Sequence, residues 1–330
     1  MCIGIDVSQA SLDIAIVGTS EKVLNHAQFS NDAAGHKQLQ HYLKKRVEKG
    51  AAICLEATGS YGEAVTEYLY GQGYAVSVVN PARIKAYAAS QLRRNKTDKL
   101  DAALIADFCR TQTPGLWTPP APAWRELRAL VRHLEDLESD QQRQENRLHA
   151  VQHSSYQAVT VQSNLQQQID WLQQQIEQVK AQIQKHIDQQ PDLKREHELL
   201  VSIKGLGDLT AAKLLAEFRA ITEFEDVRQL VAYAGLNPRQ RQSGTSVKGV
   251  SHISKTGRAS IRAALYMPAI CAQQHNPILR VYALRLAQAG VCKMAIVIAV
   301  MRKLLHLVYG ILKSGQPFDP HHLEKDVVSA

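Results

Sequence analysis

The stretch MCIGIDVSQASLDIAIVG, residues 1–18, decides the fold at the start of this chain. It predicts an apolar strand over residues 2–5, a carboxylate at Asp6, a tight polar turn and a second apolar strand over residues 12–17. A carboxylate at the end of a buried strand is unfavourable unless a cation meets it. We therefore expect Asp6 to have a cationic partner.

Strands and helices continue to alternate beyond this stretch. We expect a strand over residues 23–28, a helix over 31–49, a strand over 51–55, a helix over 62–70, a strand over 74–79 and a helix ending near residue 90. The order β-β-β-α-β-α-β-α predicts an α/β domain whose first strands form antiparallel hairpins.

Three further acids lie at the ends of expected elements. Glu56 follows the strand over residues 51–55, and Asp98 and Asp101 open a helix over residues 99–109, which Thr97 or Asp98 can cap. Because Asp98 and Asp101 are three residues apart, both can point to one side of the first turn. They could also simply favour the helix dipole. Four acids without a histidine or cysteine cluster predict a hard cation held by oxygen, most simply Mg²⁺.

Charge points to a polyanionic partner. The chain has 330 residues, with 39 Lys and Arg against 31 Asp and Glu, and a formal net charge of +8. Residues 239–318 hold twelve Lys or Arg and no acid. A basic stretch can be a solvated face, but one of this length without an acid favours contact with nucleic acid.

The five cysteines are odd in number and show no CxxC spacing, so neither a disulfide framework nor a structural zinc site is indicated. Most are flanked by apolar residues, which predicts core positions and fits a reducing cytoplasm. No signal peptide opens the sequence, and the longest apolar run, residues 294–301, is too short to span a bilayer, so we expect no membrane partner.

The middle of the chain reads as long helices. Four prolines within residues 113–122 predict a domain border. Apolar residues then recur by four and three from Leu165 to Ile183, which is a heptad seam that ends before Pro191. This pattern suits either an antiparallel helical hairpin or a dimerising coiled coil.

The C-terminal part is predicted to be mainly helical. Residues 198–218 resemble a helix-hairpin-helix, in which glycines near Lys204 let the backbone approach a phosphate, although a plain helix-helix turn is the alternative. Residues 238–265 form a basic loop rich in Gly and Ser, where any one serine is more commonly a hydrogen-bond donor than a nucleophile. Helices follow over residues 261–312.

The sequence thus predicts three domains, over residues 1–113, 114–195 and 196–330. The candidate nucleic-acid-binding residues are Arg93, Arg94, Lys96, Lys204, Gly205, Gly207, Arg239, Arg241, Lys248, Lys255, Arg258 and Arg262.

An ordered set of motifs resembles a known family. The motifs are GID (4–6), CLEATGSYG (54–62), RNKTDKLDA (94–102), IKGLGDLTA (203–211), AGLNPR (234–239), SGTSVKG (243–249) and ISKTGRASIRAALYMPA (253–269). Together they resemble the DEDD transposases of insertion sequences, a family that includes site-specific DNA invertases and bridge-RNA-guided recombinases. The resemblance implies an N-terminal domain like Holliday-junction resolvases of the ribonuclease H type. It places the metal-binding quartet at Asp6, Glu56, Asp98 and Asp101.

The same resemblance implies a covalent mechanism. A serine joined to DNA corresponds to Ser243, with Ser246 as the second choice. The implied partners are donor and target DNA and a non-coding bridge RNA. The implied assembly is a tetramer, a dimer of dimers, in which the acids of one subunit complete the serine site of another. The setting would be the bacterial cytoplasm, in association with the nucleoid.

Three alternatives remain open at this point. A metal-dependent, structure-specific nuclease would need the acids but not Ser243. An actin-like kinase or ATPase also opens with GID and a hairpin, but the sequence has no second glycine-rich phosphate loop. A non-catalytic DNA-binding protein would tolerate alanine at all four acids.

Overall fold

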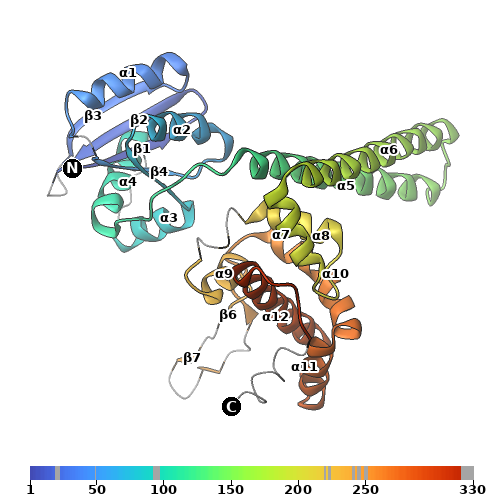
Figure 1. Ribbon diagram of the computed structural model, residues 1–330. Coiled ribbons are helices and arrows are strands. Elements are labelled where there is room, and N and C mark those ends of the chain that lie inside the picture. The colour runs from blue at the N-terminus through green and yellow to red at the C-terminus, as the bar shows by residue number, and fades with distance from the viewer. Residues whose placement is uncertain are drawn as a thin grey trace, which may run out of the picture. The chain divides into compact units, whose positions relative to one another are not determined.

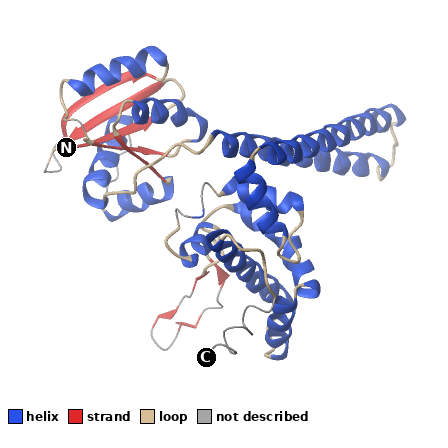
Figure 2. Cartoon of the chain, viewed as in Figure 1, coloured by secondary structure: helices blue, strands red, loops and turns tan. Residues whose placement is uncertain are grey.

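The computed structural model describes residues 1–18, 23–48, 50–91, 97–218, 221, 224–239, 242–243, 247–248 and 252–320, with only the backbone at 242–243 and 247–248. The chain divides into two compact units, Met1–Pro119 and Pro120–Ala330 (Figures 1 and 2). The boundary lies inside the expected proline-rich border. The middle helices and the C-terminal helices share the second unit, so their separation into two domains stays a prediction.

The first unit contains a five-stranded sheet in the order β3-β2-β1-β4-β5 (Figure 1). The strands are β1 Cys2–Val7, β2 Ser11–Val17, β3 Val23–Ser30, β4 Ala52–Glu56 and β5 Ala75–Val79. Strands β1, β2 and β3 form antiparallel hairpins, as expected, and β4 pairs parallel with both β1 and β5. This mixed sheet is consistent with a ribonuclease H-like domain.

Helices cover both faces of the sheet (Figure 2). They are α1 Ala33–Lys44, the short 3₁₀ turn Gly59–Gly62, α2 Glu63–Gly71, α3 Pro81–Ser90 and α4 Asp98–Gln112. One apolar core joins the sheet to α1 and α2, and a second joins it to α3 and α4. Helix α1 ends five residues earlier than expected, because Val47 turns back onto the first core.

Helix α4 approaches β1 unusually closely at Gly4. A Cβ atom built on Gly4 would lie 2.2 Å from the Ala102 carbonyl oxygen and 2.3 Å from the Ala106 backbone nitrogen. Small residues on the helix, including Ala102 and Ala106, complete the contact with Ala15 and Val17 of β2. Glycine is therefore required at position 4 for α4 to lie on the sheet.

The second unit begins with two long helices that pack side by side (Figure 1), α5 Pro122–Gln152 and α6 Val159–Gln189. The residues of the predicted seam, Leu165 to Ile183, are buried, and α5 contributes Leu134 and Leu137 to the same core. The Gln141 side-chain amide on α5 donates to Gln173 Oε1 on α6 at 2.8 Å. Within one chain this is the helical hairpin; a role for these helices in joining subunits stays a prediction.

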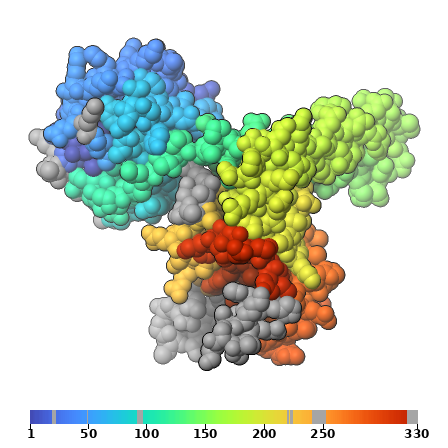
Figure 3. All heavy atoms as spheres, in the orientation of Figure 1, coloured from blue at the N-terminus to red at the C-terminus, as the bar shows by residue number. Residues whose placement is uncertain are grey.

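The remaining helices pack together, most of them directly against α12. They are α7 Pro191–Val201, α8 Asp208–Glu217, α9 Val227–Tyr233, α10 Ala259–His275, α11 Pro277–Gln288 and α12 Lys293–Ser314. Among the helices that the structure describes, α12 alone has the length and composition to cross a membrane. Part of it is visible at the surface in Figure 3, but its inner side joins the core through residues such as Val300, Leu304 and Val308. It is the central core helix of this unit.

The turn between α7 and α8 explains one of the predicted glycines. Gly205 has a φ of +108°, and a Cβ there would lie 2.7 Å from the Ala272 Cβ on α10. The Asn276 side-chain amide donates to the Lys204 carbonyl oxygen at 3.1 Å. Gly205 is thus needed for the turn and its packing, whereas Gly207 is exposed and has no such neighbour among the described residues.

The contact at Gly4 gives a direct test. We expect Gly4→Ala to destabilise the protein by about 2 kcal/mol or more, because the backbone of α4 cannot give way as a flexible side chain would. Chemical denaturation measures the free energy of unfolding. Gly71→Ala on the exposed side of α2 is the matched control and should cause no loss. Equal effects at the two positions would contradict the role of Gly4.

Candidate active site

The pleat of the sheet sorts acidic and apolar side chains onto opposite faces. Ile3 and Ile5 of β1 belong to the core under α1 and α2, so Asp6 points to the other face, which α4 covers. In β4, Leu55 belongs to the same core, so Glu56 also points toward the α4 side. Asp6 lies within β1 rather than after it, one residue from the end of the strand.

The first turn of α4 supplies the other two acids. The Thr97 hydroxyl accepts a hydrogen bond from the Leu100 backbone N–H at 3.3 Å, so Thr97 is the N-cap, one of the two residues expected for it. Asp98 is the first residue of the helix and is exposed, whereas Asp101 is half-buried. The close packing at Gly4 brings this turn to the face that carries Asp6.

The charges of the neighbouring acids act on Asp6. Burial, followed by the negative charges of Asp101, Asp98, Glu56 and Asp13, raises the pKa of Asp6 to about 6 from its ordinary value of 3.8. The other three acids predicted from the sequence therefore all act on the carboxyl group of Asp6. A group whose pKa is shifted by like charges in this way is a candidate for function.

Asp13 belongs to this face and was missed by the sequence reasoning. It lies directly opposite Asp6 in the β1–β2 ladder, and it is only 6% exposed. The Gln28 side-chain amide donates to Asp13 Oδ2 at 3.0 Å, and His26 Nε2 lies 3.4 Å from Oδ1. The alternation within residues 11–17 signals an inward-facing acid, but only the strand register places it beside Asp6. We call the five carboxylates of Asp6, Asp13, Glu56, Asp98 and Asp101 the acidic face.

The acidic face suits a divalent cation in its chemistry. All its donors are carboxylate oxygens, which are the ligands of Mg²⁺, and a cation would offset the repulsion that raises the pKa of Asp6. Among the described residues, no three Asp, Glu, His or Cys side chains converge closely enough to hold a metal as they stand. Binding would therefore require the carboxylates to move toward a common centre.

The cysteines offer no reactive thiol near this face. Cys54 and Cys109 are buried, and Cys2 packs against them in the core beneath α3 and α4. A hydrogen bond with Cys54, followed by burial, raises the pKa of the Cys109 thiol, which disfavours the thiolate. Core positions were expected for most of the cysteines, and these three have them, whereas Cys271 and Cys292 are exposed.

The basic loop has some regular structure. Strands β6 Pro238–Arg239 and β9 His252–Ile253 pair at its base. Farther along, β7 Gln242–Ser243 pairs with β8 Val247–Lys248, with Ser243 opposite Val247. The side chains of Ser243 and Lys248 lie outside the described part of the structure. The predicted residues Arg93, Arg94, Lys96, Arg241 and Ser246 lie outside the described residues altogether.

The remaining predicted cationic residues differ in solvent exposure and in their hydrogen bonds within the protein. Lys204, Arg239 and Lys255 are exposed. Arg262 donates to the Ala234 carbonyl oxygen at 2.9 Å and so secures the end of α9. Arg258 is partly exposed and donates through Nε to the Tyr233 hydroxyl at 3.1 Å.

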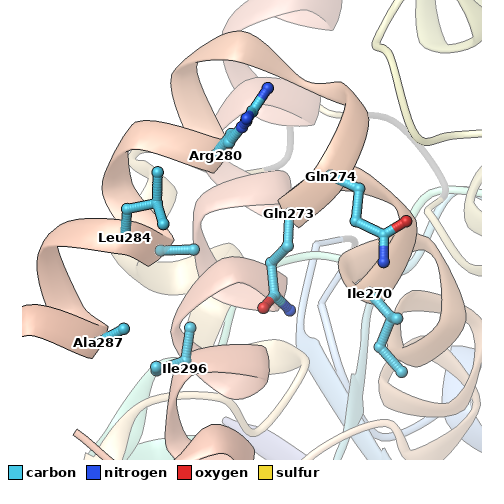
Figure 4. A pocket seen from close by; sticks show the side chains of 8 residues that line it. Ile270, Gln273, Gln274, Arg280, Leu284, Ala287 and Ile296 are labelled. Atoms are coloured by element: carbon cyan, nitrogen blue, oxygen red, sulfur yellow. The ribbon is translucent and has the colours of Figure 1, made fainter. Parts of the chain in front are cut away.

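A hollow between α10, α11 and α12 has a volume of about 510 Å³ (Figure 4). Its wall includes Ile270, Gln273 and Leu284, and Arg280 is the one charged residue among the described residues that line it. Because these lining residues include no carboxylate or hydroxyl group, this hollow is not the candidate active site.

Two family models match the chain. One, for DEDD transposases of the IS110 type, is described as a transposase and matches residues 3–157. The other is described as the transposase family IS116/IS110/IS902 and matches residues 197–283. The first match spans all five residues of the acidic face.

Relatives match over nearly the whole length. The pilin gene-inverting protein of Moraxella bovis is 32% identical over 320 residues, which cover 96% of this chain and 97% of that protein. The pilin gene-inverting protein of Moraxella lacunata is also 32% identical, with the same coverage of 96% and 97%. An insertion element IS110 protein of 43.6 kDa from Streptomyces coelicolor is 29% identical over 117 residues, or 36% of this chain and 29% of that protein.

The raised pKa of Asp6 makes stability depend on pH. Between pH 3.8 and about 6 the unfolded chain ionises Asp6 before the folded protein does, so the folded state holds more protons and loses stability as pH rises. We therefore expect Asp6→Asn to raise the melting temperature in the presence of a chelator, more at pH 7.5 than at pH 5. The exposed control Glu48→Gln should show no such trend. A gain in Asp6→Asn that is equal at both pH values would contradict the electrostatic origin.

Proposed function

Because this chain belongs to the IS116/IS110/IS902 family of transposases, we propose that it cuts and rejoins the DNA of an insertion sequence through a phosphoserine intermediate, assisted by Mg²⁺ and guided by a bridge RNA. Membership of this family indicates that the protein is a DNA transposase or recombinase, an enzyme that acts on DNA. The serine, the metal and the RNA are the finer parts of the proposal. The observation that carries it is the acidic face, where four like charges and burial act on Asp6.

The acidic face would hold the cation. Asp6, Glu56, Asp98 and Asp101 are the proposed ligands, and Asp13, held by Gln28 on the strand opposite, adds negative charge beside Asp6. A bound Mg²⁺ would neutralise these carboxylates and polarise a phosphoryl oxygen of the DNA. The protein's own part is to fix the acids on strands and a capped helix, and to keep Asp6 ionised once a cation offsets the repulsion.

Ser243 is the proposed nucleophile, with Ser246 second. The Ser243 Oγ would form a bond to a backbone phosphorus and lose its proton, while the bond from that phosphorus to a deoxyribose oxygen breaks and the released hydroxyl takes up a proton. A hydroxyl from another DNA end would then attack the same phosphorus and release the serine. Because one phosphodiester bond is exchanged for another, rejoining needs no ATP. Cations of the same segment, such as Lys248 and Lys255, would favour the charge that develops on the phosphate.

The partners follow from the same proposal. Donor and target DNA would bind the cations of the second unit, including Lys204, Arg239 and Lys255, which are exposed. Sequence choice would come from pairing with a bridge RNA. A tetramer, as a dimer of dimers, would bring the acidic face of one subunit to the Ser243 segment of another. The two most similar relatives reported above are named for inverting a gene, and inversion uses the same exchange of phosphodiester bonds.

Covalent trapping tests the proposal. The protein is co-expressed with its flanking element DNA, so that any guide RNA is present, and is then mixed with labelled donor and target DNA and Mg²⁺. After denaturation, we expect labelled DNA to migrate with the wild-type protein and not with Ser243→Ala or Asp6→Ala. The loss in each variant should exceed about 100-fold, because each removes a group that takes part in the reaction.

Two control variants make the result specific. Ser246→Ala and Glu48→Gln should keep the adduct. Loss of the adduct in Ser246→Ala, with retention in Ser243→Ala, would move the nucleophile to Ser246. Cleavage without any adduct in the wild type would contradict the covalent mechanism and favour a metal-dependent nuclease.

A further inference from the structure

Three arginines from two parts of the second unit lie near one another, beside the buried carboxylate of Glu217. Arg128 and Arg132 are one turn apart on α5, and Arg258 precedes α10 as its N-cap residue. Glu217 is the last residue of α8. We call these four residues the arginine cluster. Neither Arg128 nor Arg132 stands out in the sequence, because both resemble the polar face of a long helix.

The contacts of the arginine cluster are incomplete. Arg258 Nε lies 3.7 Å from Glu217 Oε2, at side-chain exposures of 43% and 9%. Glu217 Oε2 and Arg128 Nε are both buried, and neither has a hydrogen-bond partner among the described residues. Buried polar atoms are normally paired, so unpaired ones at a single place call for an explanation.

The charges of the arginine cluster do not balance. Burial, followed by the positive charges of Arg132 and Arg258, lowers the pKa of Arg128. The negative charge of Glu217 raises this pKa, but its effect is smaller than that of either arginine. Burial also works against the charge of Arg258, but Tyr233 and Glu217 leave its pKa raised. The surroundings of Arg128 are therefore positive on balance.

The neighbouring acids on α5 interact with a cation outside the arginine cluster. Lys213 on α8 lies 2.9 Å from Glu138 on α5. Glu135 is influenced first by burial, which raises its pKa, and then by Lys213, while Arg132 comes last among its causes. These acids are thus directed mainly toward Lys213, and Arg132 remains exposed.

We propose that Arg132 and Arg258, with Arg128 behind them, bind a phosphate of a nucleic-acid backbone. Guanidinium groups suit phosphate oxygens because each offers several donors in one plane. The N-terminus of α10 adds its dipole, since no acid occupies its first turn. Arg258 follows β9, which pairs with β6, so the cluster lies at the base of the segment that carries Ser243. The inference needs the family's nucleic-acid substrates, but neither the metal nor the serine.

The alternative is an ion-pair network that only joins α5 to α8 and α10. The two explanations predict different effects of the substitution Glu217→Gln. If the cluster binds phosphate, Glu217 competes with it, and Glu217→Gln should strengthen nucleic-acid binding. If the cluster is structural, Glu217→Gln should lower stability and leave binding unchanged.

Equilibrium binding by the full-length protein tests the proposal, in chelator so that cleavage does not interfere. The probes are a labelled DNA duplex and, separately, the RNA that copurifies with the protein, each titrated over a range of salt concentrations. We expect Arg132→Gln and Arg258→Gln each to weaken binding about fivefold or more and to reduce the salt slope by about one. Glu217→Gln should strengthen binding severalfold.

Arg143→Gln is the matched control, because Arg143 lies on the same helix, is 65% exposed and pairs with Asp140. Its binding should match the wild type. An effect confined to the duplex assigns the phosphate to DNA, one confined to the RNA assigns it to RNA, and an effect on both supports a contact shared by the two. Arg132→Gln binding like Arg143→Gln on both probes would overturn the proposal. So would Glu217→Gln that melts earlier without binding more tightly.

Discussion

The close contact between α4 and β1 is the constraint on which the acidic face depends. Without a side chain on Gly4, the backbone of α4 meets the strand directly at Ala102 and Ala106. Asp101 precedes the first of these alanines, so the same contact sets the distance between Asp101 and Asp6. Any larger residue at position 4 would lift the helix and separate the acids. Gly4 therefore determines both the packing of α4 on the sheet and the position of the acids.

This packing places like charges together, which is unfavourable by itself. Burial and this repulsion together raise the pKa of Asp6, and Asp13 adds to the repulsion from the neighbouring strand. Proteins keep such arrangements where a ligand relieves them, and a divalent cation is the ligand that carboxylates favour. We expect lower stability at neutral pH for the same reason that a cation would bind well. Gln28 and His26 hold Asp13 in place, so the protein does not relax the repulsion by turning this side chain away.

Local patterns in the sequence predicted those structural features that depend only on residues close together in the chain. The cap at Thr97, the alternation that buries Ile3 and Ile5, and the acids at element ends all follow from residues close together in the chain. Asp13 was missed because its place beside Asp6 depends on the register between two strands. Arg128 was missed because a helical pattern does not reveal which helix packs against it. Contacts between distant segments, rather than element types, were the information that the sequence lacked.

The charges of the two units differ in a way that suits a nucleic-acid enzyme. The acidic face belongs entirely to the first unit, whereas residues 239–318 of the second unit carry no acid at all. Carboxylates and guanidinium groups on one surface would pair with each other, as Glu217 and Arg258 do in part. Kept on separate units, the cations stay available to phosphates and the carboxylates to a cation. Under the proposed function, the acidic face would repel phosphate, so attachment to nucleic acid would come first from the cations of the second unit, and the metal would serve the chemistry alone. The proposal therefore makes nucleic-acid binding and cleavage separable, because binding would persist in chelator and cleavage would need Mg²⁺.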